Sequence, residues 1–110
     1  MKIRLISKQS LEEYCSKNSN SKKAIRSWLT ALKFANWLSP NDIKSTFGSS
    51  NLLGKGKNRV VFDLGGNNYR MICKYYWGEN NIHLFVCWIG THSEYTQLCK
   101  ENKQYTIRDF

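Results

Sequence analysis

A helical repeat of apolar positions marks residues 22–37. The apolar residues recur at steps of three and four, which is the spacing of one face of an α-helix, and they include Ile25, Trp28, Leu29 and Leu32. Lysines and an arginine occupy the remaining positions. The pattern therefore predicts an amphipathic helix with a basic outer side.

Two further helical segments are predicted from capping residues. Ser10, with Glu12 and Glu13 in the turn that follows, is typical of a helix start. Pro40, the only proline, is expected to end the long helix and to begin a short helical turn capped by Ser39.

Alternating polar and apolar residues predict strands. Residues 2–7 form a short run whose lysine and arginine indicate a sheet edge. Three β-rich runs with short connections follow at 58–64, 68–77 and 82–90, as in an antiparallel meander. Residues 103–107 are a candidate for an added edge strand. The sequence thus predicts an α+β domain with one sheet.

Composition agrees with one folded unit. The chain has 110 residues, 41% of them hydrophobic and 14% aromatic. This is enough apolar material for a single core, and it excludes the disordered class. We expect one domain over residues 1–110.

The charge balance favours a polyanionic partner. Lysine and arginine number 17 against eight acidic residues, which gives a formal net charge of +9. Such an excess suits nucleic acid or an acidic protein. A solvated basic surface is the alternative, and charge alone does not choose between them.

The start of the chain lacks the apolar core of a signal peptide, and no stretch is long enough to span a membrane. We therefore expect a cytoplasmic protein without membrane contact. The four cysteines show no CxxC pairing and no histidine at zinc-finger spacing. They are expected to be reduced and mostly buried, with no metal site and no cofactor.

The glycine-rich loop at 48–58 resembles a phosphate-binding loop only superficially. Five residues separate Gly48 from Gly54, where a Walker motif has four, and Lys55 is followed by Gly56 instead of serine or threonine. Walker-type nucleotide binding is therefore not expected.

The strand at 68–77 has two different faces. A period of two places one set toward the interior: Tyr69, Met71, Cys73, Tyr75 and Trp77. The other set is Asn68, Arg70, Ile72, Lys74 and Tyr76. Cations beside an exposed aromatic ring suit a nucleic-acid backbone, although a solvated sheet face has the same pattern.

His92 and Tyr95 lie one turn apart where the last helix is expected to begin. Thr91 and Glu94 have the spacing of a capping box. The helix dipole favours a neutral imidazole at this position, and free amides of the first turn can bind phosphate. The alternative is a plain helix cap with His92 solvated and Tyr95 packed.

Four motifs in a fixed order resemble one known family. They are W-x-S-P-x-D at 37–42, N-R-V-V-F-D at 58–63, G-N-N-Y-R at 66–70 and G-T-H-S-E-Y at 90–95. Residues 35–98, with the helix at 24–37, resemble the HigB toxins of bacterial type II toxin-antitoxin systems, within the RelE-like superfamily. The resemblance implies a RelE-like fold, in which two N-terminal helices pack on one face of an antiparallel sheet and a short C-terminal helix follows.

The resemblance also implies an activity, namely metal-independent endoribonuclease cleavage of messenger RNA, usually on the ribosome. It implies Arg70 as the main phosphate clamp with support from Arg59, His92 as general acid or base, and Tyr95 as a positioning group. Lys55 and Lys57 in the loop would hold the RNA backbone or contribute acid-base help. Independently of the resemblance, the face pattern of the strand at 68–77 makes Lys74 a candidate for contact with the RNA backbone and Tyr76 a candidate for base stacking. For Arg70 the alternative is a surface cation paired with an acid such as Asp63.

The implied partners are messenger RNA, the ribosome and a HigA-type antitoxin with a helix-turn-helix domain. Operator DNA would be bound only through the toxin-antitoxin complex. Two competing hypotheses use the same basic surface without turnover: an RNA- or ribosome-binding module, and a binder of acidic proteins.

Overall fold

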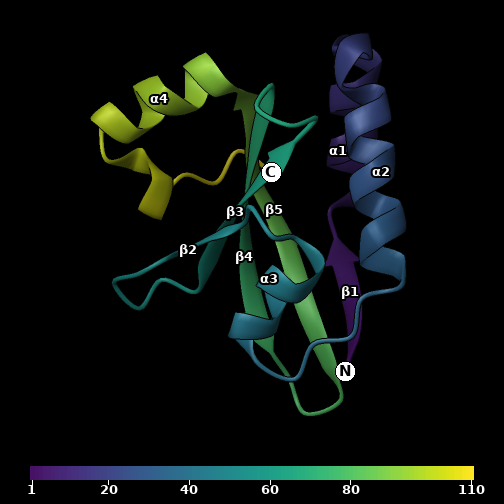
Figure 1. Cartoon of the computed structure of the whole chain (residues 1–110). Coiled ribbons are helices and arrows are strands. Elements are labelled where there is room, and N and C mark those ends of the chain that lie inside the picture. The colour runs from purple at the N-terminus through teal and green to yellow at the C-terminus, as the bar shows by residue number, and fades with distance from the viewer.

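The β-rich part of the chain forms the centre of the molecule. A computed structural model describes all residues 1–110, and in it five strands form one sheet in the order β1-β5-β4-β3-β2 (Figure 1). The strands are β1 (Lys2–Ile6), β2 (Asn51–Leu53), β3 (Arg59–Leu64), β4 (Tyr69–Trp77) and β5 (Asn81–Thr91). The predicted meander is confirmed, because β3, β4 and β5 pair antiparallel in chain order, and β2 adds an antiparallel partner to β3.

Two features of the sheet differ from the prediction. Strand β1 lies at an edge as expected, but it pairs parallel to β5, so the sheet is mixed and not wholly antiparallel. A parallel pair needs a long crossover, and the whole chain between β1 and β5 provides it. The 48–58 segment, predicted as a loop, contains the short edge strand β2.

The helices begin and end at other residues than predicted. The first helix, α1 (Lys8–Lys17), starts before Ser10, so Ser10 is not its cap. The second, α2 (Lys22–Lys33), ends well before Pro40. The chain leaves the helix there and Trp37 turns into the core, where its indole N–H donates to the Thr46 hydroxyl at 3.0 Å.

Other local predictions had mixed outcomes. Pro40 begins a 3₁₀ turn (Pro40–Asp42), which leads into α3 (Ile43–Thr46). The last helix, α4 (His92–Lys100), begins at the predicted residue. The candidate strand at 103–107 is wrong, because Lys103–Tyr105 form a 3₁₀ turn.

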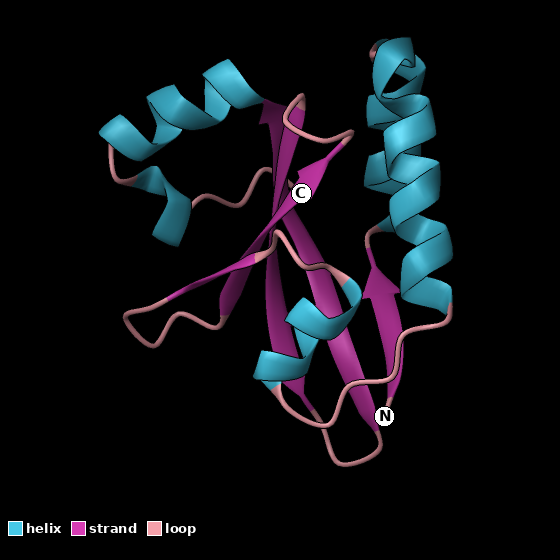
Figure 2. Cartoon of the chain, viewed as in Figure 1, coloured by secondary structure: helices cyan, strands magenta, loops and turns pink.

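The two faces of the sheet are covered by different elements. Helices α1 and α2 pack against one face, and α4 projects from the other (Figures 1 and 2). The α1/α2 face holds a core of 15 buried residues. The α4 face holds a cluster of only five, namely Val61, Ile72, Cys87, Trp88 and Leu98.

A β-bulge in β5 adjusts which residues face each side. Ile72 pairs with Trp88 and Cys73 with Val86, so Cys87 has no partner on β4. As a result Cys87 and Trp88 both belong to the α4-side cluster, while Val86 and Ile89 both belong to the main core. A bulge bends the strand and redirects side chains in this way.

The two predicted faces of β4 are confirmed. Met71 and Cys73 lie in the main core, with Tyr69, Tyr75 and Trp77 packed against it. On the opposite face Arg70 and Ile72 are buried, whereas Lys74 and Tyr76 are exposed.

Candidate functional site

The start of α4 is fixed by the predicted capping box. The Glu94 amide donates to the Thr91 hydroxyl at 3.2 Å, and the Thr91 amide donates to the Glu94 carboxylate at 2.8 Å. The His92 amide donates to the Asn68 carbonyl at 3.0 Å. Because two first-turn amides already have partners, a phosphate here would be bound mainly by side chains.

Gly90 brings β5 close to this helix start. A β-carbon at Gly90 would lie 2.5 Å from the Trp88 ring and 3.0 Å from the Glu94 carboxylate. Any larger residue would therefore displace the ring that packs beneath α4. Gly90 also pairs with Arg70 in the ladder, so it links the helix start to β4.

Arg70 is held in one orientation by three oxygens. Its Nε donates to the Asp63 carboxylate at 3.0 Å, and its Nη1 donates to the Tyr69 carbonyl at 3.1 Å. Its Nη2 donates to the Asn67 amide oxygen. The pairing with Asp63 matches the alternative predicted for Arg70, but the residue is 9% exposed and is not a free surface cation. A guanidinium carries five N–H donors, so it keeps unused donors for a ligand.

Tyr95 packs on the sheet face that also holds Arg70, and His92 is the first residue of the helix that carries Tyr95. His92 is exposed, so its ring is open to a ligand and not part of the apolar interior. Tyr95 is half-buried against Trp88, with ring centroids 6.1 Å apart. Burial, with a hydrogen bond to Cys99, raises the Tyr95 pKa well above its usual value, whereas the nearby Arg70 charge lowers it. We call Arg70, His92 and Tyr95 the His92 cluster.

Arg59 has a different environment from Arg70. It is 4% exposed and forms no salt bridge. Its Nη1 donates to the Ile107 carbonyl at 2.8 Å and to the Gln104 carbonyl at 3.2 Å. In this structure Arg59 therefore anchors the tail, by which we mean residues 101–110, against the sheet.

Of the two predicted RNA-binding lysines of the loop, Lys55 lies beside the tail. The Lys55 Nζ lies 4.5 Å from the centroid of the Tyr105 ring. The Tyr105 phenol in turn adds to the rise of the Tyr95 pKa, so the loop adjoins the His92 cluster through Tyr105. Lys57 is exposed and has no such contact.

The other two predicted contacts lie farther along the sheet. Lys74 pairs with Arg59 on one side and Phe85 on the other, and Tyr76 pairs with His83. Both side chains are exposed. They share a sheet face with Arg70, but they lie toward the opposite end of β4.

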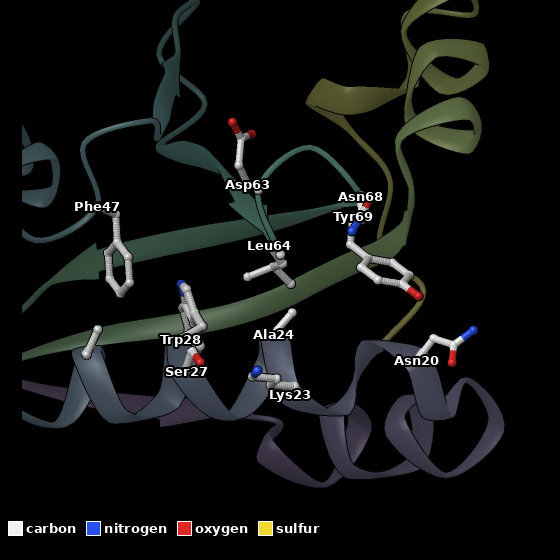
Figure 3. A pocket seen from close by; sticks show the side chains of 13 residues that line it. Asn20, Lys23, Ala24, Ser27, Trp28, Phe47, Asp63, Leu64, Asn68 and Tyr69 are labelled. Atoms are coloured by element: carbon white, nitrogen blue, oxygen red, sulfur yellow. The ribbon is translucent and has the colours of Figure 1, made fainter.

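A hollow of about 520 Å³ lies on the other side of the sheet, between α2 and the turn that joins β3 to β4. Figure 3 shows Leu64 directed toward the helix and Asp63 directed away from it. Neither His92, Arg70 nor Tyr95 lines this hollow. The turn at 65–68 thus separates the hollow from the His92 cluster.

Sequence reasoning missed the residues that orient the cluster. Asn67 and Asn68, in the turn, hold Arg70 and the start of α4 respectively. The signal was the Gly65-Gly66 pair, whose positive φ angles of 60° and 67° mark a tight turn. Asparagines beside such a turn are free to make local hydrogen bonds.

Comparison with known proteins identifies the family. Residues 21–98 match the family described as HigB toxin, the RelE-like toxic component of a toxin-antitoxin system. The chain belongs to the HigB toxin family. It is also 30% identical over 105 residues to the mRNA interferase HigB of Escherichia coli O6:H1, which covers 93% of this chain and all of that relative.

The matched range of the HigB family includes the predicted site residues but not the tail. All the predicted site residues fall inside residues 21–98, as do Asp63, Asn67 and Asn68. The tail falls outside that range, although Arg59, which anchors it, lies inside the range.

None of the helices is long and apolar enough to span a membrane.

Proposed function

We propose that this HigB-family toxin is an endoribonuclease that cleaves messenger RNA without a metal ion, on the translating ribosome. The observation that carries the proposal is Arg70, whose buried guanidinium is held in one orientation and keeps unused donors. Its ladder partner Gly90 lies two residues before His92, which is exposed at the start of α4. The net charge of +9 and the name of the Escherichia coli relative, mRNA interferase, support RNA as the substrate.

The proposed chemistry needs only side chains. The ribose 2′-hydroxyl attacks the adjacent phosphorus, and the P–O5′ bond breaks to leave a 2′,3′-cyclic phosphate and a 5′-hydroxyl. His92 transfers a proton at the 2′-oxygen or the 5′-oxygen. Arg70 donates to the phosphate oxygens as negative charge develops on them.

Tyr95 has a narrower role in this proposal. Burial raises the pKa of its phenol, so the hydroxyl stays protonated at neutral pH. A protonated phenol donates a hydrogen bond but does not remove a proton. Tyr95 would therefore position the phosphate or a base while His92 moves the proton. Arg59 would support the site indirectly, by holding the tail, whose Tyr105 lies near Tyr95.

His92→Ala tests the proposal. Purified toxin is incubated with translating ribosomes, and new 5′ ends in the messenger are mapped. Wild type is expected to give discrete cuts, and the variant is expected to cut about 10²- to 10⁴-fold more slowly because one proton-transfer group is lost. Gln97→Ala removes an exposed polar side chain from the same helix, α4, and serves as the matched control.

Three results would count against the proposal. Ribosome occupancy without cuts favours the non-catalytic binding module. Full cleavage by His92→Ala removes the histidine from the mechanism. Loss of cleavage with a chelator, restored by added metal, contradicts metal independence.

Membership of the HigB toxin family implies an antitoxin partner. We propose a HigA-type antitoxin with a helix-turn-helix domain, a shared operator bound only by the complex, and a cytoplasmic location. Co-expression with the gene of the proposed antitoxin should relieve growth arrest. The resulting complex should retard operator DNA in a gel-shift assay, whereas the toxin alone should not.

A further inference from the structure

Three rings form a row on the sheet face that α1 and α2 leave uncovered. Tyr76 and His83 pair across β4 and β5, with ring centroids 6.1 Å apart. His83 and Phe85 lie two residues apart on β5, with centroids 6.5 Å apart and planes at 27°. Tyr76 is 64% exposed and Phe85 37% exposed. We call these three residues the ring row.

The tail brings two more side chains to this surface. The Asp109 amide donates to the Cys87 carbonyl at 2.8 Å, at the residue that the bulge leaves without a partner on β4. Together with the Arg59 anchor, this bond returns the tail to the middle of the sheet (Figure 1). Arg108 and Phe110 then line a groove of about 600 Å³ with Lys74, Tyr76 and Phe85.

The charged side chains that line the groove all have one sign. Among the side chains that line it, Lys74 and Arg108 are the charged ones, and none is aspartate or glutamate. Arg4 on β1 is exposed and pairs with His83, so it adds a third cation at the ring row. Exposed rings interleaved with unpaired cations form a surface on which bases stack and phosphates are neutralised.

We propose that this groove is a subsite for single-stranded RNA, formed only when the tail is docked. Bases would stack on Tyr76, Phe85 and Phe110, while Lys74 and Arg108 would contact phosphates. Lys74 lies four residues from Arg70 along β4, roughly 13 Å at the rise of a strand. The subsite therefore holds nucleotides flanking the scissile phosphate, so the inference rests on the proposed function and extends it.

Binding of a non-cleavable strand tests the subsite separately from catalysis. Anisotropy is measured with a short, fluorescent, fully 2′-O-methylated single-stranded RNA, which lacks the attacking hydroxyl. Phe85→Ala and Phe110→Ala are each expected to weaken binding roughly 5- to 150-fold, as for loss of one base-aromatic stack. Phe34→Ala, an exposed ring at the end of α2 that is 78% exposed, is the matched control and should bind like wild type.

The proposed contact between Arg108 and an RNA phosphate is tested through the salt dependence of RNA affinity. Arg108→Gln is expected to reduce the slope of log affinity against log salt by about 0.7, the value for one phosphate of a single strand. Arg26→Gln, an exposed arginine on α2, should keep the wild-type slope. Wild-type affinity and slope in Phe85→Ala, Phe110→Ala and Arg108→Gln would overturn the subsite.

Three further outcomes separate this inference from its alternatives. If wild type cuts messenger on ribosomes while the ring variants bind and cut like wild type, the subsite is wrong and the proposed function stands. If the strand binds through the ring row but no cuts appear, the subsite stands and the nuclease is wrong. Loss of antitoxin binding alone in Phe85→Ala would assign the groove to a protein partner and overturn the RNA subsite. Thermal melting of each variant confirms that it is folded.

Discussion

The two faces of the sheet differ in what they bury. The α1/α2 face buries 15 apolar residues, and there Trp28 stacks on Phe47 while Phe62 meets both rings edge-on. The α4 face buries five apolar residues together with two arginines, Arg59 and Arg70. A buried guanidinium is costly unless its donors are bonded, and each arginine is bonded by a turn or by the tail.

We expect the α1/α2 face to supply most of the folding stability and the α4 face to carry the proposed RNA chemistry. The large core allows the opposite face to keep cations, an exposed histidine and open rings that would not stabilise a fold by themselves. Variants on the α1/α2 face should therefore change the free energy of unfolding, and variants on the α4 face should mainly change activity and RNA affinity. Four predictions test that separation.

The largest effect is expected at Arg70. Arg70→Ala should slow messenger cleavage at least as much as His92→Ala, by ~10²-fold or more, because it removes the donor to the developing phosphate charge. Arg70→Lys should recover only part of the rate, since an ammonium lacks the planar fork. Cleavage is measured by mapping 5′ ends on ribosomes.

The control for Arg70 lies on the other side of the molecule. Arg26→Ala removes an exposed arginine from α2 and should leave cleavage unchanged. Near wild-type cleavage by Arg70→Ala would mean that Arg70 only pairs with Asp63, and the proposed clamp would be wrong.

The second effect is on stability. Phe62 is 1% exposed, and its ring lies 5.0 Å from Phe47 and 5.2 Å from Trp28. Phe62→Ala should lower the free energy of unfolding in urea by about 3 to 5 kcal/mol, through lost transfer energy and a cavity. Leu98→Ala, in the small cluster under α4, should cost about 2 kcal/mol. The reverse order would contradict the separation of the faces.

The third effect concerns the buried cation that holds the tail. Arg59→Met keeps the packing of the side-chain stem but leaves the Gln104 and Ile107 carbonyls without their donor, at a cost of about 1 to 3 kcal/mol. The tail should also become sensitive to protease. If cleavage falls while the tail stays protected, Arg59 acts on RNA directly, and its structural role is not the reason for the loss.

Much of the fold was predictable because it follows from local patterns. The period of two in β4 and the capping box of Thr91 and Glu94 are set by neighbouring residues, and both are confirmed. The parallel pairing of β1 was not predictable, because its partner lies almost 80 positions away, as in the pair Ile3 and Ile82. The end of α2 was also missed, since it depends on where Trp37 packs.

Sequence motifs name candidate residues for the site, but most of the bonds that hold these residues are visible only in the folded chain. The motif G-N-N-Y-R points to Arg70, and a pairing with Asp63 was one predicted alternative, yet only the folded turn shows that Asn67 also bonds the guanidinium. For Arg59 the motif gives no sign that the guanidinium is bonded by the tail, because Gln104 and Ile107 are more than 40 residues distant. The bulge at Cys87, which places the Asp109 amide, likewise has no local sequence signal.

The smallest expected effect is a loss of folding stability at alkaline pH, to which one buried group on each face contributes. Burial raises the Cys73 thiol pKa well above its ordinary value of 9.0, and burial raises the Tyr95 phenol pKa above 10.0. Below about pH 9 the folded and unfolded states both keep these protons, so they add no pH dependence. Above it the unfolded chain ionises first, and stability should fall with rising pH.

The expected slope is about 1.4 kcal/mol per pH unit for each group, first from Cys73 in the main core and then from Tyr95 under α4. Urea unfolding at about pH 8 and about pH 10 measures it. Cys73→Ala should flatten the fall near pH 9, whereas Val86→Ala, its ladder partner without a titratable group, should lower stability equally at both pH values. An unchanged slope in Cys73→Ala would mean that the thiolate is as well solvated in the folded protein as in the unfolded chain, which contradicts a sealed core on the α1/α2 face.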